Sequence, residues 1–307
     1  MSDIVIEVKN LTKKYENKGF SSIALDGISF DIKRGEFVSL IGPDGAGKTT
    51  LIKALCGLLE FDEGDVKILG FNLPLQKEHI KERIGYLSQR FSLYGNLTVE
   101  ENLHYFAAVF GVKDYAEKME KLMEIVNLKE YRNRLARNLS GGMKQKLSVI
   151  CGLIHSPEIF FLDEPTTGVD PVSRREIFKL IEQMIANGLT VVMSTSYMDE
   201  AERAHRVIML NKGKILQQGS YEELIAECKW RNLVIETNEV EYIKGIIAAL
   251  QGVKFINAFS RLIYVLVDDS FSVDEVNEMV RGHIDNIYFS EIGMEGLFIA
   301  NTMMLGF

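Results

Sequence analysis

A glycine-rich segment with one lysine and two threonines is the first place in this sequence where the residue types could do chemistry. It has the spacing G-x-x-x-x-G-K-[ST], and it consists of Gly42, Pro43, Asp44, Gly45, Ala46, Gly47, Lys48, Thr49 and Thr50. The apolar run 37–41 predicts a strand before it, and the spacing of leucines in 51–59 predicts a helix after it. Glycines let backbone N–H groups converge on phosphate oxygens. We therefore predict a nucleotide site in which Lys48 contacts the β- and γ-phosphates and Thr49 offers its hydroxyl to Mg²⁺.

A second candidate group lies where an apolar run ends in two carboxylates. Residues 159–162 predict a buried strand, and Asp163 and Glu164 follow directly. A buried carboxylate needs a compensating partner, and Mg²⁺ held by Asp163 would provide one. Glu164 would then be placed to polarise an attacking water. Alone, such a pair is more often the solvated start of a loop, so this prediction depends on the phosphate loop.

A third segment, with the sequence LSGGMKQ at 139–145, opens a predicted helix. Ser140 is a suitable N-cap, and Gly141 and Gly142 leave backbone N–H groups open to an anion. Taken alone, the segment has one plain alternative, an ordinary capped helix. It is, however, the second helix start in the chain that could bind an anion, and Ser140 precedes Asp163 by 23 residues.

Composition excludes several other classes of protein. The chain has 307 residues, 47% hydrophobic and 25% charged, which excludes disorder or low complexity as a description of the whole. Its three cysteines lie far apart, so we expect a reducing compartment and neither a disulfide scaffold nor a zinc site. A formal net charge of −8 gives no support to nucleic-acid binding. With no signal peptide in view and no long apolar run, we expect a chain that does not itself span a membrane.

The elements that must position these residues alternate between strands and helices. From strands predicted at 4–8 and 23–32 onward, the alternation indicates an α/β fold with a largely parallel sheet and covered faces. Residues 98–137 have helical periodicity, many charges and no clear strand. After about residue 225 the pattern restarts as βαββαβ, which predicts a small α+β ferredoxin-like domain. The predicted domains are 1–224, with a helical subdomain at about 90–157, and 225–307.

With these motifs in view, residues 4–222 resemble the ATP-binding cassette (ABC) transporter ATPases, and LSGGMKQ resembles the signature motif of that family. The resemblance implies a RecA-like P-loop core with a helical subdomain, ATP and Mg²⁺ as ligands, and ATP hydrolysis. In this family ATP lies between the phosphate loop of one subunit and the signature of another. The resemblance therefore implies a partner subunit, either a second copy of the chain or a homologous ATPase.

Three further positions take their roles from the resemblance. Tyr15, in LTKKY, matches the aromatic residue that stacks on adenine, although an ordinary strand tyrosine is the alternative. Gln89, in YLSQR, matches the glutamine that ligates Mg²⁺ and senses the membrane partner, and the segment around 89–100 would transmit closure to that partner. Asp170, in TTGVDP, matches the aspartate that crosses the dimer interface.

Within the family, the segments GPDGAGKTT, QRFSLYGNLTVEENL and STSYMDEAE resemble the ATPase subunits of bacterial multidrug exporters. This implies an integral-membrane permease as partner, a peripheral place at the cytoplasmic face of the cell membrane, and export of drugs or other small or amphipathic molecules. The C-terminal segment resembles an accessory domain of some exporter ATPases. No nucleic-acid partner is expected. Import, a soluble ABC protein of translation or DNA repair, and a regulatory module with little turnover stay open as alternatives.

Two positions depart from the family pattern. Ser196 stands where most relatives have a histidine that contacts the γ-phosphate, and a serine side chain is shorter by about 2–3 Å. We therefore expect hydrolysis that is present but slow. His205 is expected to have an ordinary structural role, because a predicted helix leads away from the site before it. Asp44, where many relatives have Asn or Ser, has no assigned role.

Overall fold

The computed structural model describes residues 3–17, 20–89, 93–268 and 270–304. The chain divides into two units, 1–218 and 219–307. Helix α8 (Tyr221–Glu227) begins the second unit, so the predicted boundary after residue 224 falls inside this helix. The first unit contains two sheets and the second contains one, and the hydrophobic core of each unit is separate.

A six-stranded sheet forms the centre of the first unit, with the order β10-β9-β3-β8-β7-β6. Its strands are β3 (Phe37–Ile41), β6 (Ile84–Leu87), β7 (Ile159–Asp163), β8 (Thr190–Thr195), β9 (Arg206–Asn211) and β10 (Lys214–Gly219). From β9 to β6 all neighbouring strands pair in parallel. Every residue of β3, β7 and β8 is buried, because both faces of this sheet are covered. The prediction of a largely parallel sheet is confirmed.

A second, antiparallel sheet has the order β2-β1-β4-β5. Its strands are β1 (Ile4–Asn17), β2 (Phe20–Lys33), β4 (Glu63–Ile68) and β5 (Phe71–Leu73). Helix α1 (Lys48–Leu55) shares one hydrophobic core with residues of both sheets. Strands β1 and β2 extend beyond the predicted strands at 4–8 and 23–32. Their pairing continues through polar residues, with several register shifts along the pair.

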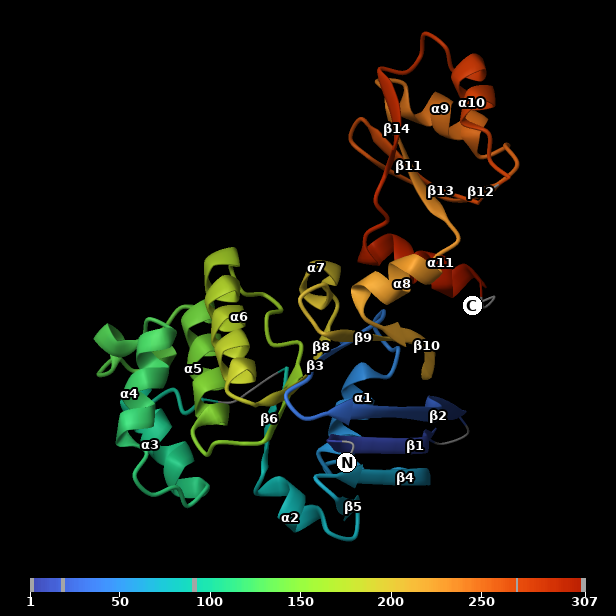
Figure 1. Ribbon diagram of the computed structural model, residues 1–307. Coiled ribbons are helices and arrows are strands. Elements are labelled where there is room, and N and C mark those ends of the chain that lie inside the picture. Colours follow the sequence, from blue (N-terminus) through green and yellow to red (C-terminus); the bar gives the residue numbers. More distant parts are fainter. Residues whose placement is uncertain (1–2, 18–19, 90–92, 269, 305–307) are drawn as a thin grey trace. The chain divides into compact units, whose positions relative to one another are not determined.

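The helices of the first unit cover the opposite face of the central sheet. Figure 1 shows them gathered on the side away from β1, β2, β4 and β5. They are α3 (Val99–Val109), α4 (Ala116–Ile125), α5 (Gly141–Leu153) and α6 (Pro171–Ala186), with the short helices α2 (Lys77–Lys81) and α7 (Met198–Ala201) elsewhere in the unit. The predicted helical character of 98–137 agrees with α3, α4 and two short 3₁₀ turns. Residues 90–92, which open the predicted subdomain and belong to the predicted coupling segment, lie outside the described residues.

The second unit is an antiparallel sheet of the order β12-β13-β11-β14. After α8 its elements are β11 (Arg231–Glu236), α9 (Val240–Ile247), β12 (Val253–Phe259), β13 (Leu262–Val267), α10 (Val273–Met279), β14 (Asn286–Ser290) and α11 (Met294–Met304). This order of βαββαβ elements and strands is the ferredoxin-like fold that the sequence predicts. The side chains of β11 and β13 that face α9 and α10 form its core.

None of the helices in the described ranges combines the length and the hydropathy that crossing a membrane would require.

Candidate nucleotide-binding site

The candidate residues follow four neighbouring parallel strands at the edge where those strands end. The phosphate loop follows β3, the acids Asp163 and Glu164 end β7, Gln89 follows β6, and Ser196 follows β8. Because parallel strands end at one edge of a sheet, residues far apart in the sequence meet there. The structure describes a cleft of about 380 Å³ at this edge, lined by Ala24, residues 43–50, Gln89 and Glu164.

The backbone of the phosphate loop requires glycine at its two ends. Gly42 and Gly47 have φ angles of 154° and 108°, which side chains rarely allow. A Cβ atom at Gly42 would lie 2.2 Å from the carbonyl oxygen of Leu210, and one at Gly47 would lie 2.6 Å from that of Ala24. Gly47 is also the N-cap of α1 and supplies no side-chain cap, so the first N–H groups of this helix are available to an anion.

Lys48 is buried in the loop with its ammonium directed at the loop backbone. Its side chain is 5% exposed, and Nζ donates hydrogen bonds to the carbonyl oxygens of Gly42 at 2.6 Å and Pro43 at 3.2 Å. Nζ also lies 3.8 Å from Oε1 of Glu164. The two residues that the sequence assigns to phosphate binding and to water activation are therefore in contact through their charged groups.

Asp163 lies beneath the loop as a buried carboxylate, 1% exposed. Its Oδ1 atom accepts hydrogen bonds from Oγ1 of Thr49 at 2.9 Å and from Oγ of Ser194 at 2.7 Å. Burial, together with the charge of Asp163, raises the pKa of the Cys56 thiol and of the Tyr86 hydroxyl, so both of these neighbours stay neutral. Among the residues that the structure describes, no cationic side chain pairs with Asp163, and a carboxylate beside a threonine hydroxyl is a donor set that fits Mg²⁺.

Glu164 has a left-handed backbone, with φ of 50°, which is uncommon for a residue with a side chain. Its amide donates to both the carbonyl and the hydroxyl oxygen of Ser194, and this bonding holds the turn. Its Oε2 atom accepts hydrogen bonds from Nε2 of Gln89 at 3.1 Å and from Oγ1 of Thr167 at 3.2 Å. Strained backbone of this kind often occurs at functional sites, where the surroundings fix one side-chain direction.

Tyr15 is 43% exposed on β1, and the ammonium of Lys13 lies 5.7 Å from the centre of its ring. It pairs with Ser22 on β2, two residues before Ala24, which lines the cleft. Tyr15 itself does not line the cleft. Its predicted contact with adenine stays a prediction.

Ser140, Gly142 and Asp170 form a second group, and none of them lines the cleft of the same chain. Ser140 caps α5, since its hydroxyl accepts a hydrogen bond from the amide of Met143. Asp170 caps α6, since its Oδ1 accepts from the amides of Val172 and Ser173. These contacts with Ser173 lower the pKa of Asp170 and keep it charged. The starts of α5 and α6 therefore lie together, which the sequence did not predict.

Gly142 is the point where these two helix starts touch. A Cβ atom there would lie 2.3 Å from Oγ of Ser173 and 2.6 Å from Oδ2 of Asp170. We expect Gly142→Ala to disrupt the cap of α6 and to lower stability by about 1–3 kcal/mol. Thermal unfolding measures this as a midpoint several degrees lower. Gly141→Ala is the matched control, because a Cβ at Gly141 meets nothing within 4 Å. Equal midpoints for the two variants would contradict the prediction.

Ser196 is exposed and lies directly after β8. His205 is remote from this edge: its Nδ1 accepts a hydrogen bond from the amide of Phe37 at the start of β3, whereas the phosphate loop follows the end of that strand. The expectation of a structural role for His205 agrees with this contact.

The sequence did not predict the buried acid Glu200, four residues after Ser196. Glu200 is 1% exposed, and it accepts hydrogen bonds from the hydroxyls of Thr195 and Thr166, each at 2.6 Å. Nε of Arg174 lies 3.4 Å from Glu200, as an ion pair without hydrogen-bond geometry. Glu200 thus joins the end of β8, the segment after β7 and helix α6. The sequence signal for Glu200 is weak. It is one of several acids in the short segment after β8, and acids at that place are equally typical of a solvated helix start.

Glu200→Ala should leave the buried hydroxyls of Thr195 and Thr166 without their acceptor and should remove one of the two carboxylates paired with Arg174. We expect a loss of about 3 kcal/mol in the free energy of unfolding. Denaturant titration of the purified chain measures this value. Asp199→Ala is the control. Asp199 also pairs with Arg174, at 3.8 Å, but its side chain is 75% exposed, so its removal leaves no buried group without a partner. A loss no larger than that of the control would show that the network does not stabilise this edge.

The chain was compared with known proteins. A family model described as ABC transporter matches residues 25–167. The chain is 42% identical over 227 residues to the probable multidrug ABC transporter ATP-binding protein YbhF of Escherichia coli (strain K12), a match that covers 73% of this chain. The chain spans only 39% of the length of YbhF. It is 35% identical over 228 residues to Nod factor export ATP-binding protein I of Burkholderia pseudomallei (strain 1710b), covering 73% of this chain and 74% of that protein.

Solved structures give the same result. A structure described as an ATP binding subunit of an ABC transporter matches with a TM-score of 0.66 and 29% identity, over 73% of this chain and 92% of that one. The dimeric post-hydrolysis state of the ATP-binding cassette MJ0796, bound to ADP and Pi, matches with a TM-score of 0.63 and 28% identity, over 70% and 98%. From the sequence relatives, the fold and these likenesses together, the chain belongs to the ABC transporter family of ATP-binding proteins.

Proposed function

We propose that this chain binds and hydrolyses ATP as the motor subunit of an ABC exporter, acting as a homodimer on a separate membrane permease. The main support for this proposal is that Lys48, Glu164 and Gln89 lie together in one cleft. The hydrogen-bonded pair of Thr49 and Asp163 lies beside them. Phosphoryl transfer needs a cation for the phosphates and an oriented acceptor for the attacking water. Both groups are present within 3.8 Å of each other.

In the proposed first step the loop 42–49 binds the phosphates of ATP through its backbone N–H groups. Lys48 turns from the carbonyl oxygens of Gly42 and Pro43 to the β- and γ-phosphates, and Tyr15 stacks on the base. Mg²⁺, when bound, would be held by Thr49, Asp163 and Gln89, and would neutralise charge on the β- and γ-phosphate oxygens.

In the second step two subunits close on the nucleotide. Ser140 and Gly142 of one subunit contact the γ-phosphate bound by the other, and Asp170 crosses between them. Two observations support this arrangement. The start of α5 does not line the cleft of its own chain, and the start of α6 is packed against it at Gly142. A site completed by a partner also accounts for the glycine at 141, where a Cβ would meet nothing within 4 Å in the chain itself.

In the chemical step Glu164 accepts a hydrogen bond from the attacking water and orients it. The water oxygen forms a bond to the γ-phosphorus while the bond to the β–γ bridging oxygen breaks. Glu164 takes up the proton that the water loses, and ADP leaves with the electron pair of the broken bond. Lys48 stabilises the charge that develops on the phosphate oxygens. Release of phosphate then reopens the dimer, and the segment around 89–100 transmits the change to the permease.

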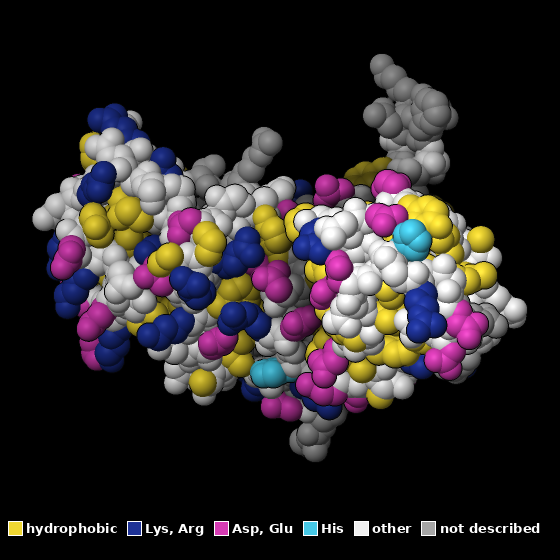
Figure 2. Space-filling view, turned by 90° about the horizontal axis from the view of Figure 1, so that it is seen from above, with side chains coloured by type: hydrophobic (Ala, Val, Ile, Leu, Met, Phe, Trp, Pro, Cys, Tyr) yellow, Lys and Arg dark blue, Asp and Glu magenta, His cyan; other side chains and the backbone are white. Residues whose placement is uncertain are grey.

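The export assignment rests on relatives whose names describe multidrug, Nod factor export and daunorubicin resistance proteins. On the face shown in Figure 2, Lys and Arg side chains are interspersed with Asp and Glu, a pattern that does not favour nucleic acid. The test is affinity purification of the tagged chain from membranes of its own cell. We expect a protein with several membrane spans to co-purify; recovery with ribosomes instead would favour the soluble alternative.

Ser196 favours one second candidate, a nucleotide-gated regulatory subunit with very slow turnover. A steady-state ATPase assay of the chain together with its permease distinguishes the two. Turnover that the permease stimulates supports the motor, whereas a rate that stays negligible supports the regulatory subunit.

A further inference from the structure

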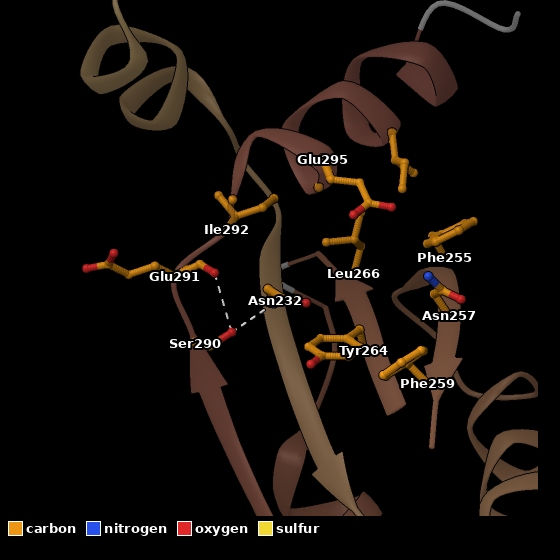
Figure 3. Close-up of a pocket in the computed structure, with 13 residues that line it drawn as sticks. Asn232, Phe255, Asn257, Phe259, Tyr264, Leu266, Ser290, Glu291, Ile292 and Glu295 are labelled. Carbon is orange, nitrogen blue, oxygen red and sulfur yellow. Dashed lines mark hydrogen bonds between the residues drawn. The ribbon is translucent and has the colours of Figure 1, made fainter. Parts of the chain in front are cut away.

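The sheet of the second unit has two unlike faces. One face carries α9 and α10 over the apolar core. The residues that point to the other face include Phe255 and Phe259 of β12 and Tyr264 and Leu266 of β13, and helix α11 covers only part of them. A pocket of about 510 Å³ lies between this face and the start of α11 (Figure 3). Its volume is in the range of sites for small organic molecules.

The lining of the pocket combines buried apolar and aromatic side chains. Leu266 and Ile292 are buried, at 4% and 7% exposed. Phe259 is 75% exposed, an unusual position for a phenylalanine, while Phe255 and Tyr264 are half-buried. Figure 3 shows the three rings on the same side of β12 and β13. Three rings around one space offer their electron-rich faces to a cation as well as contact area to an apolar body.

The charged groups of the pocket have one sign. Glu295, on the first turn of α11, directs its carboxylate down toward Leu266 and the sheet (Figure 3). None of the ion pairs found among the described residues includes Glu295. Glu291 also lines the pocket, but its side chain points away from the rings. The residues that line the pocket include no Lys, Arg or His, so an anionic ligand would find no counter-charge there.

The charge of the whole unit has the same sign. Residues 219–307 contain six Lys and Arg against 14 Asp and Glu, whereas residues 1–218 contain 29 of each. The entire formal charge of −8 therefore belongs to the second unit. A field of this sign raises the local concentration of cations at the pocket.

We propose that this pocket binds a lipophilic organic cation, with its aromatic or alkyl body against Phe255, Phe259 and Tyr264 and its positive centre near Glu295. The site lies wholly in the second unit and is distinct from the nucleotide site. The remaining polar groups suit this ligand. The amide of Asn232 donates to Oγ of Ser290 at 2.8 Å, and the side chains of Asn232 and Asn257 are uncharged, so they offer an anion no counter-charge.

The test compares two probes of nearly the same shape and opposite charge, tetraphenylphosphonium and tetraphenylborate, in calorimetric titrations of the full chain. We expect the cation to bind with a 1:1 stoichiometry and at least about tenfold more tightly than the anion, because the site holds one carboxylate and no cationic side chain. Equal affinity for both ions, or no saturable binding of the cation, would overturn the proposal.

Variants then locate the site. Glu295→Gln should weaken binding of the cation about fivefold while leaving binding of the uncharged probe triphenylphosphine oxide unchanged. Phe259→Ala should weaken binding of both probes, and Glu291→Gln is the control that should change neither. Thermal unfolding checks that each variant is folded. Unchanged affinity in both Glu295→Gln and Phe259→Ala contradicts the assignment. So does light scattering that shows a dimer of the parent chain dissociated by Phe259→Ala, since a second copy would then cover this face.

Discussion

Replacing Glu164 with Gln should abolish turnover while leaving ATP binding intact. The amide keeps the size of the side chain and can still contact Gln89 and Thr167, but it cannot polarise the attacking water. We expect the steady-state rate to fall by ~10²–10⁴-fold, the range of a lost general base. Affinity for ATP should hold or improve, because a negative charge 3.8 Å from the Lys48 ammonium is removed. Radiolabelled phosphate release measures the rate, and equilibrium binding measures the affinity.

The same variant should accumulate as a closed dimer with ATP bound, since the step that reopens the dimer is blocked. Small-angle scattering with saturating ATP reports the mass directly. Glu182→Gln is a control, because Glu182 is a residue of α6 that is 55% exposed and pairs with Arg203 at 3.3 Å, away from the phosphate loop. Undiminished turnover would remove Glu164 from its proposed role. A purely monomeric Glu164→Gln chain at saturating ATP would contradict the composite site itself.

Replacing Ser196 with His should accelerate hydrolysis. Ser196 is exposed at the end of β8, next to β7, which carries Asp163 and Glu164. Ser196 does not itself line the cleft, and an imidazole there reaches about 2–3 Å further than a serine hydroxyl. If the parent chain lacks one transition-state donor, worth about 2–4 kcal/mol, we expect turnover to rise by ~10²–10³-fold. Single-turnover measurements isolate this effect from product release.

Binding of ATP should change little in Ser196→His, so the gain should appear in the rate and not in the affinity. His205→Asn is the matched control, because it keeps an acceptor for the amide of Phe37 at the far end of β3. A Ser196→His chain no faster than its parent would mean that the serine is fully competent or that another group donates the bond.

The phosphate loop and the acids of β7 were predictable because their geometry is local. A loop between a strand and a helix must return within a few residues, so the positions of Gly42 and Gly47 already define it. Because these strands are parallel, the sequence also predicts that the residues following β3, β6, β7 and β8 meet at one edge of the sheet. This topology predicts that Lys48 and Glu164 lie at the same edge of the sheet. It does not predict the 3.8 Å between their charged groups.

Contacts between distant segments were not predictable in the same way. Glu200 reads as a surface acid, and only the packing of α6 and of the segment after β7 makes it a buried acceptor. The approach of Gly142 to Asp170 depends on the angle between α5 and α6. The pocket of the second unit depends on where α11 lies over the sheet. The sequence predicted the strands of that unit, but it carries no signal for how far a terminal helix covers them.

If the chain acts on a membrane permease, as proposed above, the placement of its acidic residues has a consequence. Bacterial inner leaflets and other cytoplasmic leaflets are rich in anionic headgroups, which repel negative charge over a Debye length of about 8 Å. The portion 219–307, with its surplus of eight carboxylates, would be pushed toward the aqueous phase, while the balanced portion 1–218 feels no such force. In the proposed assembly, electrostatics would thus favour residues 1–218 over residues 219–307 for contact with the leaflet, and high salt would weaken that preference.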